Sequence, residues 1–157
     1  MSLWQILVER NEELTGKRAT DAEIAMMKAK LPEGLLSESF EQVLRSFGLA
    51  GKQFEISEQE DLSRFGVSLY WLSPSQILSE ALEAYPGRLA SFAGFLPIGA
   101  CAFGSGDPYF LDLRQQASDP PLVRIPHELA RVQPFDCAGI DLITRSLSKF
   151  PSVCTIR

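Results

Sequence analysis

The chain has 157 residues, enough for one globular domain, and its 45% hydrophobic and 22% charged residues are ordinary for such a domain. Its net charge of −5 lies entirely in residues 1–61, which hold twelve acidic and seven basic residues, whereas residues 62–157 hold eight of each. The chain lacks the clustered Lys and Arg that bind phosphate backbones, and it lacks the long apolar run of a membrane span. We therefore expect a single domain over residues 1–157 that binds neither nucleic acid nor membrane.

The N-terminus and the cysteines indicate the compartment. The first residues lack the basic and apolar segments of a signal peptide, so we expect a cytoplasmic protein. Cys101, Cys137 and Cys154 are an odd number and form no Cys-x-x-Cys pair. Reduced, buried thiols fit this pattern better than disulfides or a zinc site, and we expect no metal and no cofactor.

The N-terminal part predicts helices. A short helix is expected over 4–10, and a firmer one begins at Thr20, where Thr20-Asp-Ala-Glu23 fits a capping box, and stops at Pro32. A further helix over 36–47 carries an apolar stripe of Leu36, Phe40, Val43, Leu44 and Phe47. The short connection between these last two helices favours antiparallel packing.

The pattern then changes to strands. Segments 52–56 and 67–72 are rich in strand-forming residues, and Ser73-Pro74 begins a middle helix that Pro86-Gly87 ends. Three more strands are expected over 92–101, 107–113 and 121–125. A closing helix is predicted from the helical spacing of Ile140, Ile143, Leu147 and Phe150. The sequence predicts an α+β domain with a largely antiparallel sheet of about five strands, packed against an N-terminal helix pair, a middle helix and a C-terminal helix.

The segment from Phe95 to Glu128 concentrates residues that often carry chemistry. Gly99, Gly104 and Gly106 make the segment glycine-rich, but Gly104-Ser-Gly106 leads into a strand without the lysine of a phosphate loop. A hairpin turn is therefore the favoured interpretation of these glycines. Asp107 is interpreted as a turn residue whose carboxylate accepts backbone N–H groups, rather than as a metal ligand. His127, the only histidine, is expected to end a strand and to hydrogen-bond a neighbouring loop, with a general base or a partner contact as the alternatives.

A second segment concentrates charge. Glu55, Glu58, Glu60 and Asp61 place four acids within seven residues without a base. The segment is either a solvated loop or an acidic surface that docks a basic protein. Phe65, Tyr70 and Trp71 follow it and are either anchors of such an interface or core residues. For Trp71 the core is the favoured interpretation.

The order of several short motifs resembles the SMI1/KNR4 (SUKH) superfamily. Leu31-Pro32 lies between the first two firm helices, Leu96-Pro-Ile-Gly99 and Gly106-Asp107 follow in consecutive strands, and Val123 precedes His127-Glu128. The resemblance covers about residues 19–150, and the chain departs from the family pattern at Leu49-Ala-Gly51 and at Pro126. It implies a structural role for the motif residues Pro97, Gly99, Gly106, Asp107, His127 and Glu128.

The resemblance also implies a function. It indicates a non-catalytic protein-binding domain, namely a bacterial immunity protein that neutralises a cognate toxin by direct binding. With the local acidity, the expected partner is a basic toxin domain contacted by Glu55, Glu58, Glu60, Asp61, Phe65 and Tyr70. The alternatives are a regulatory or scaffold adaptor of the same superfamily and a small hydrolase built on His127.

Overall fold

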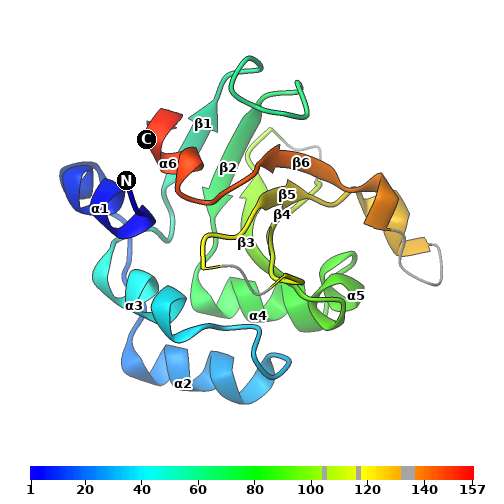
Figure 1. Cartoon of the computed structure of the whole chain (residues 1–157). Coiled ribbons are helices and arrows are strands. Elements are labelled where there is room, and N and C mark those ends of the chain that lie inside the picture. Colours follow the sequence, from blue (N-terminus) through cyan, green and yellow to red (C-terminus); the bar gives the residue numbers. More distant parts are fainter. Residues whose placement is uncertain (104–105, 116–117, 132–136) are drawn as a thin grey trace.

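The fold is a single α+β domain built on a curled antiparallel sheet (Figure 1). The structure is a computed structural model that describes residues 1–103, 106–115, 118–131 and 137–157. The strand order is β6-β5-β4-β3-β2-β1-β7, so β1 to β6 form a meander in which each strand pairs antiparallel with the next. The strands are β1 Gln53–Ile56, β2 Val67–Trp71, β3 Phe95–Cys101, β4 Tyr109–Asp112, β5 Leu122–Arg124, β6 Asp141–Thr144 and β7 Thr155–Ile156.

The described part of the chain holds six α-helices: α1 Leu3–Glu9, α2 Asp21–Lys30, α3 Glu38–Ser46, α4 Pro74–Leu82, α5 Gly87–Phe92 and α6 Lys149–Val153. Short 3-10 helices, η1 Asn11–Glu13, η2 His127–Arg131 and η3 Cys137–Gly139, connect some of these elements. None of these helices has both the length and the hydrophobicity to cross a bilayer. In Figure 1 the two chain ends lie close together, where α1 contacts α6.

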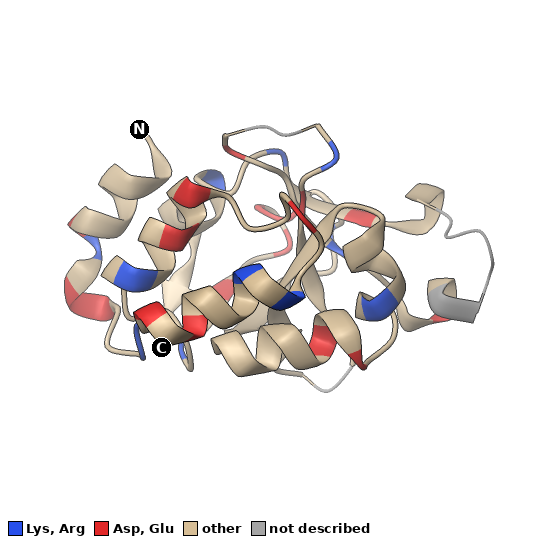
Figure 2. Cartoon of the chain, turned by 90° about the horizontal axis from the view of Figure 1, so that it is seen from below, with Lys and Arg blue, Asp and Glu red and all other residues tan. Residues whose placement is uncertain are grey.

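Helix α2 begins as the sequence predicts. Thr20 Oγ1 accepts from the Glu23 amide at 3.2 Å, and the Glu23 carboxylate accepts from the Thr20 amide at 2.8 Å, which confirms the capping box. Acidic residues lie in its first turn and basic residues in its last turn, as Figure 2 shows, and this order complements the helix dipole.

Ion pairs confirm the antiparallel arrangement of α2 and α3. Asp21 in the first turn of α2 pairs with Arg45 near the end of α3 at 2.9 Å. Lys28 in the last turn of α2 pairs with the buried Glu41 in the first turn of α3 at 3.0 Å. The start of one helix is therefore bound to the end of the other.

The two faces of the sheet pack into different apolar clusters. Tyr109 and Leu111 of β4 belong to the main core with side chains of α2, α3 and α4, and Leu113 packs against the same core. Phe110, between them, belongs to a smaller cluster with Phe95, Val123, Ile125 and Ala90 of α5. This alternation along β4 shows that both faces of the sheet are covered.

Three elements differ from the sequence expectations. The predicted closing helix over 140–150 is wrong, because Asp141–Thr144 pairs with β5 as strand β6 and a turn then leads to the short helix α6. Helix α5 and strand β7 were not expected, and the described residues form a sheet of seven strands rather than about five. Ile143, Leu147 and Phe150 still reach one core, because a strand followed by a turn and a helix brings them to the same side.

Candidate protein-binding surface

Residues 57–66 connect β1 to β2, and we call this connection the acidic loop because it holds Glu58, Glu60 and Asp61 of the acidic segment. Its central residue Asp61 is fully buried, so the expectation that Asp61 contacts a partner is wrong. The Asp61 carboxylate accepts from the Ser63 amide at 2.8 Å and from the Ser63 hydroxyl at 2.7 Å. Asp61 therefore folds the loop back on itself instead of presenting charge to solvent.

One backbone hydrogen bond closes the acidic loop on itself, and a second joins the loop to a distant strand of the sheet. The Asp61 amide donates to the Ser57 carbonyl at 3.1 Å, and the Leu62 amide donates to the Ile143 carbonyl of β6 at 3.0 Å. In the strand order, β6 is an edge strand and lies four strands from β2. The curl of the sheet thus brings the loop of one hairpin against a distant strand.

The side chain of Arg124 in β5 forms a hydrogen bond to the acidic loop. This side chain is only 9% exposed, and its Nη2 donates to Ser63 Oγ at 3.0 Å while its Nε lies 3.4 Å from Asp141 Oδ2. Burial alone would lower the pKa of Arg124, but a hydrogen bond to Tyr109 and the charges of Asp141 and Asp61 hold it above its ordinary value. A buried, paired cation of this kind fixes the loop in one conformation.

Phe65 is the aromatic residue of the acidic loop, and 72% of its surface is accessible to solvent. The Cζ atom of Arg124 lies 5.4 Å from the centroid of its ring, so the same guanidinium that binds Ser63 also supports Phe65. Leu62 and the carboxylates of Glu58 and Glu60 are exposed in the same loop. The loop therefore presents an apolar ring and the carboxylates of Glu58 and Glu60. Glu60 lies 3.8 Å from Lys149, and Arg64 is also exposed in the loop.

Glu55 and Tyr70 lie on the hairpin itself rather than in the loop. Glu55 accepts from Gln53 Nε2 at 2.8 Å and lies 3.3 Å from Arg157, so its charge is partly neutralised within the fold. Tyr70 is opposite Gln53 in the β1–β2 register and is 41% exposed. Trp71 is 4% exposed, which confirms its predicted place in the core.

Phe103 was missed by sequence reasoning and is 77% exposed. The neighbouring Ala102 amide donates to the Ser68 carbonyl near the start of β2, so Phe103 lies at the same end of the sheet as the acidic loop. An aromatic residue next to a glycine-rich turn is a signal that could have found it. Gly104 and Ser105, part of the predicted turn, lie outside the described residues.

Asp107 and His127 meet at this end of the sheet as well. Asp107 Oδ1 accepts from the His127 amide at 3.0 Å and lies 2.8 Å from His127 Nδ1, which confirms that Asp107 binds a backbone N–H and that His127 bonds a neighbouring loop. His127 does not end a strand, because β5 stops at Arg124 and His127 begins η2. Gly106 has φ +79° beside the imidazole, and Glu128 is exposed in the next position.

Pro97 and Gly99, the remaining motif residues, are buried within β3. Gly99 does not form a turn. A Cβ atom at this position would lie 2.4 Å from Leu69 Cγ of the neighbouring strand, so the glycine makes room for a buried leucine. This close approach explains a glycine inside a strand.

The comparisons with protein-family models, with curated proteins and with solved structures found no match for this chain.

Proposed function

We propose that this chain is a non-catalytic protein-binding domain whose acidic loop and Phe103 contact a basic protein. The observation that carries the proposal is the 72% exposed ring of Phe65 on a loop fixed by Arg124 and Asp61. An exposed aromatic side chain on a braced loop loses little conformational entropy on binding, and aromatic residues supply much of the energy at protein interfaces. The acidic groups beside it favour a basic partner and speed its association.

The finer proposal is an immunity protein that neutralises a cognate bacterial toxin by covering its active site. Its support is the motif order shared with the SMI1/KNR4 superfamily, together with the acidity of residues 1–61. A nuclease toxin carries a basic surface for its nucleic acid, and an acidic loop would compete for that surface. Neutralisation requires only a tight interface and no chemistry by this chain.

The test is co-expression with the toxin encoded by the adjacent open reading frame. We expect the wild-type chain to protect cells, and we expect the double variant Phe65→Ala and Phe103→Ala to bind the purified toxin at least tenfold more weakly because the apolar centre of the interface is lost. Phe92→Ala is the matched control, since Phe92 is 74% exposed on α5, away from the acidic loop. If cells that express the toxin together with the wild-type chain do not survive, the immunity role is contradicted. If the chain nevertheless binds the purified toxin, that result would favour the adaptor role.

A further inference from the structure

Arg64, which precedes Phe65 in the acidic loop, has an unusual backbone conformation. Its φ is +67°, and no other non-glycine residue in the described part of the chain has a positive φ. An ordinary side chain costs free energy in this left-handed region because its Cβ atom crowds the backbone, whereas glycine or asparagine adopts it at lower cost. An outlier of this kind, on the surface of a fixed loop, is a reason to look for a function of the residue.

The fold holds Arg64 in this conformation through its neighbours. The Arg64 amide donates to the Asp61 carbonyl at 3.0 Å, and the preceding Ser63 is bound by the Asp61 carboxylate and by Arg124. The ring of the following Phe65 also lies against Arg124. None of these contacts uses the side chain of Arg64, so the turn would form equally well with glycine or asparagine at this position. The fold alone therefore does not explain the arginine.

The charge of Arg64 is available to a group outside this chain. Its side chain is exposed and forms no hydrogen bond or ion pair with any described residue. Glu58 and Glu60 lie in the same loop, yet neither binds Arg64, and Glu60 instead lies 3.8 Å from Lys149. The acidic loop thus presents one unpaired guanidinium beside its exposed aromatic ring.

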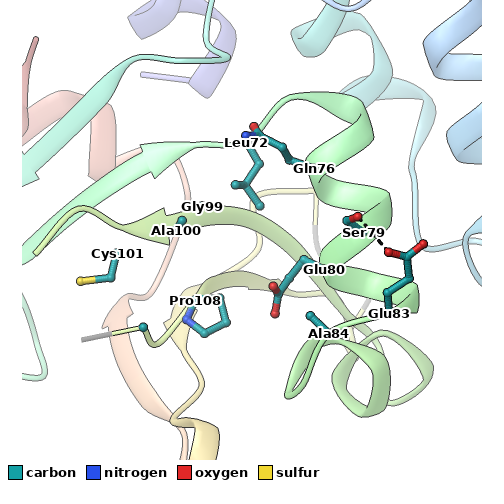
Figure 3. A pocket seen from close by; sticks show the side chains of 11 residues that line it. Leu72, Gln76, Ser79, Glu80, Glu83, Ala84, Gly99, Ala100, Cys101 and Pro108 are labelled. Atoms are coloured by element: carbon teal, nitrogen blue, oxygen red, sulfur yellow. Dashed lines mark hydrogen bonds between the residues drawn. The ribbon is translucent and has the colours of Figure 1, made fainter. Parts of the chain in front are cut away.

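Other charged groups that line a hollow of the surface are bound within the fold. A cavity of about 410 Å³ between α4 and β3 is lined by Glu80 and Glu83 (Figure 3). Glu80 accepts from the Gly87 amide, and Glu83 accepts from the Ser79 hydroxyl at 3.1 Å. These carboxylates are therefore satisfied without a ligand, in contrast to the guanidinium of Arg64.

We propose that Arg64 is a specificity-determining residue that pairs with a carboxylate of the protein partner. A guanidinium donates to both oxygens of a carboxylate in a fixed planar arrangement, and arginine is enriched among the residues that carry binding energy at interfaces. The ring of Phe65 in the next position would shield such a pair from water. The partner is then a protein whose basic surface contains an acidic group facing Arg64, and this inference rests on the protein-binding function proposed above.

The test measures binding of the purified toxin to the wild type and to Arg64→Asn by calorimetry. If the partner surface were uniformly basic, Arg64→Asn would bind more tightly, because the variant removes a positive charge from an acidic loop. We expect the opposite, at least tenfold weaker binding. Arg64→Lys should bind at least threefold more weakly than the wild type, since it keeps the charge but loses the planar pair of donors. Equal or tighter binding by Arg64→Asn, or wild-type affinity of Arg64→Lys, would overturn the pairing.

Two controls separate this contact from net charge and from stability. Arg88→Gln removes the same charge from an exposed position on α5 and should bind within twofold of the wild type, so an equal loss in this variant would overturn the inference. Arg64→Asn should also unfold at a higher urea concentration than the wild type, because asparagine relieves the backbone strain, and a lower midpoint would contradict that strain.

The experiment also distinguishes this inference from the proposed function. If the wild-type chain does not bind the toxin, the proposed function fails and this inference falls with it. If the wild type binds and Arg64→Asn binds equally well, only the role of Arg64 is refuted.

Discussion

Arg124 Nη2 donates to Ser63 Oγ at 3.0 Å although the two residues are 61 positions apart in the chain. The bond joins β5 to the acidic loop, which belongs to the hairpin at the other side of the sheet. Together with the bond from the Leu62 amide to the Ile143 carbonyl, it ties the loop to the curled sheet at two points. The position of Phe65 is therefore set by the tertiary fold and not by local turn chemistry alone.

Arg124→Gln should destabilise the chain by about 2–4 kcal/mol, because it removes one member of a buried network and leaves Asp141 and Asp61 without their cation. Urea unfolding measures this change. The Ser63 and Leu62 amides should also exchange with solvent faster than in the wild type, since their loop loses its support. Arg145→Gln, the same charge change at an exposed position, should cost less than about 0.5 kcal/mol, and equal losses in both variants would contradict the role of Arg124.

The acidic segment shows where sequence reasoning reaches its limit. Four acids in seven residues predict a solvated loop or a docking surface, and Glu58 and Glu60 are exposed, as either interpretation requires. Asp61 is buried because the acidic loop folds back onto β6 and the Asp61 carboxylate accepts a hydrogen bond from the Ser63 amide. That contact depends on the curl of the whole sheet, so no local pattern could single out Asp61 from its neighbours.

The secondary structure could be predicted where local signals and tertiary packing agree. Thr20 and Ser73 begin helices as their capping patterns indicate. The spacing of Ile143, Leu147 and Phe150 also fits a helix, yet pairing with β5 makes the first of them part of a strand. Strand β7 has only two residues and is stabilised by pairing with β1, and so it leaves no periodic signal.

Gly99→Ala should destabilise the fold by about 1–3 kcal/mol, because the new methyl group would overlap the fully buried Leu69 side chain. Thermal and urea unfolding measure the loss. The contact is tested by combining the change with Leu69→Val, which shortens the opposing side chain. The second substitution should cost less in the Gly99→Ala background than alone, and simple additivity would show that the two side chains do not meet.

Arg10→Gln should weaken the junction of the two chain ends. Arg10 Nη1 donates to the carbonyls of Pro151 at 2.8 Å and Cys154 at 2.7 Å, which joins the end of α1 to α6. Losing these charge-assisted bonds should cost about 1–3 kcal/mol in urea unfolding. Glu13→Gln removes only the exposed ion pair with Arg10 and should cost less than about 1 kcal/mol. A larger loss from Glu13→Gln would mean that the ion pair, and not the bonds to α6, stabilises this end.

Tyr109→Phe should change how stability depends on alkaline pH. Burial raises the pKa of Tyr109 from 10 to about 12 in the folded chain. The neutral phenol therefore stabilises the fold fully below pH 10, and this contribution is lost as the pH rises from 10 to 12, where only the unfolded chain ionises.

The expected loss over that window is about 2–3 kcal/mol, since each unit of pKa shift corresponds to about 1.4 kcal/mol. Phenylalanine has no such titration. Tyr109→Phe should therefore be less stable than the wild type at pH 8, where it lacks the hydrogen bond to Arg124, and the difference should shrink or reverse by pH 12. Burial raises the pKa of Cys154 to about 11, but this thiol is present in both proteins and cancels from the comparison. Urea unfolding at pH 8, 10 and 11.5 measures the difference, and a difference that stays constant across this range would show that Tyr109 is not protected from ionisation in the folded state.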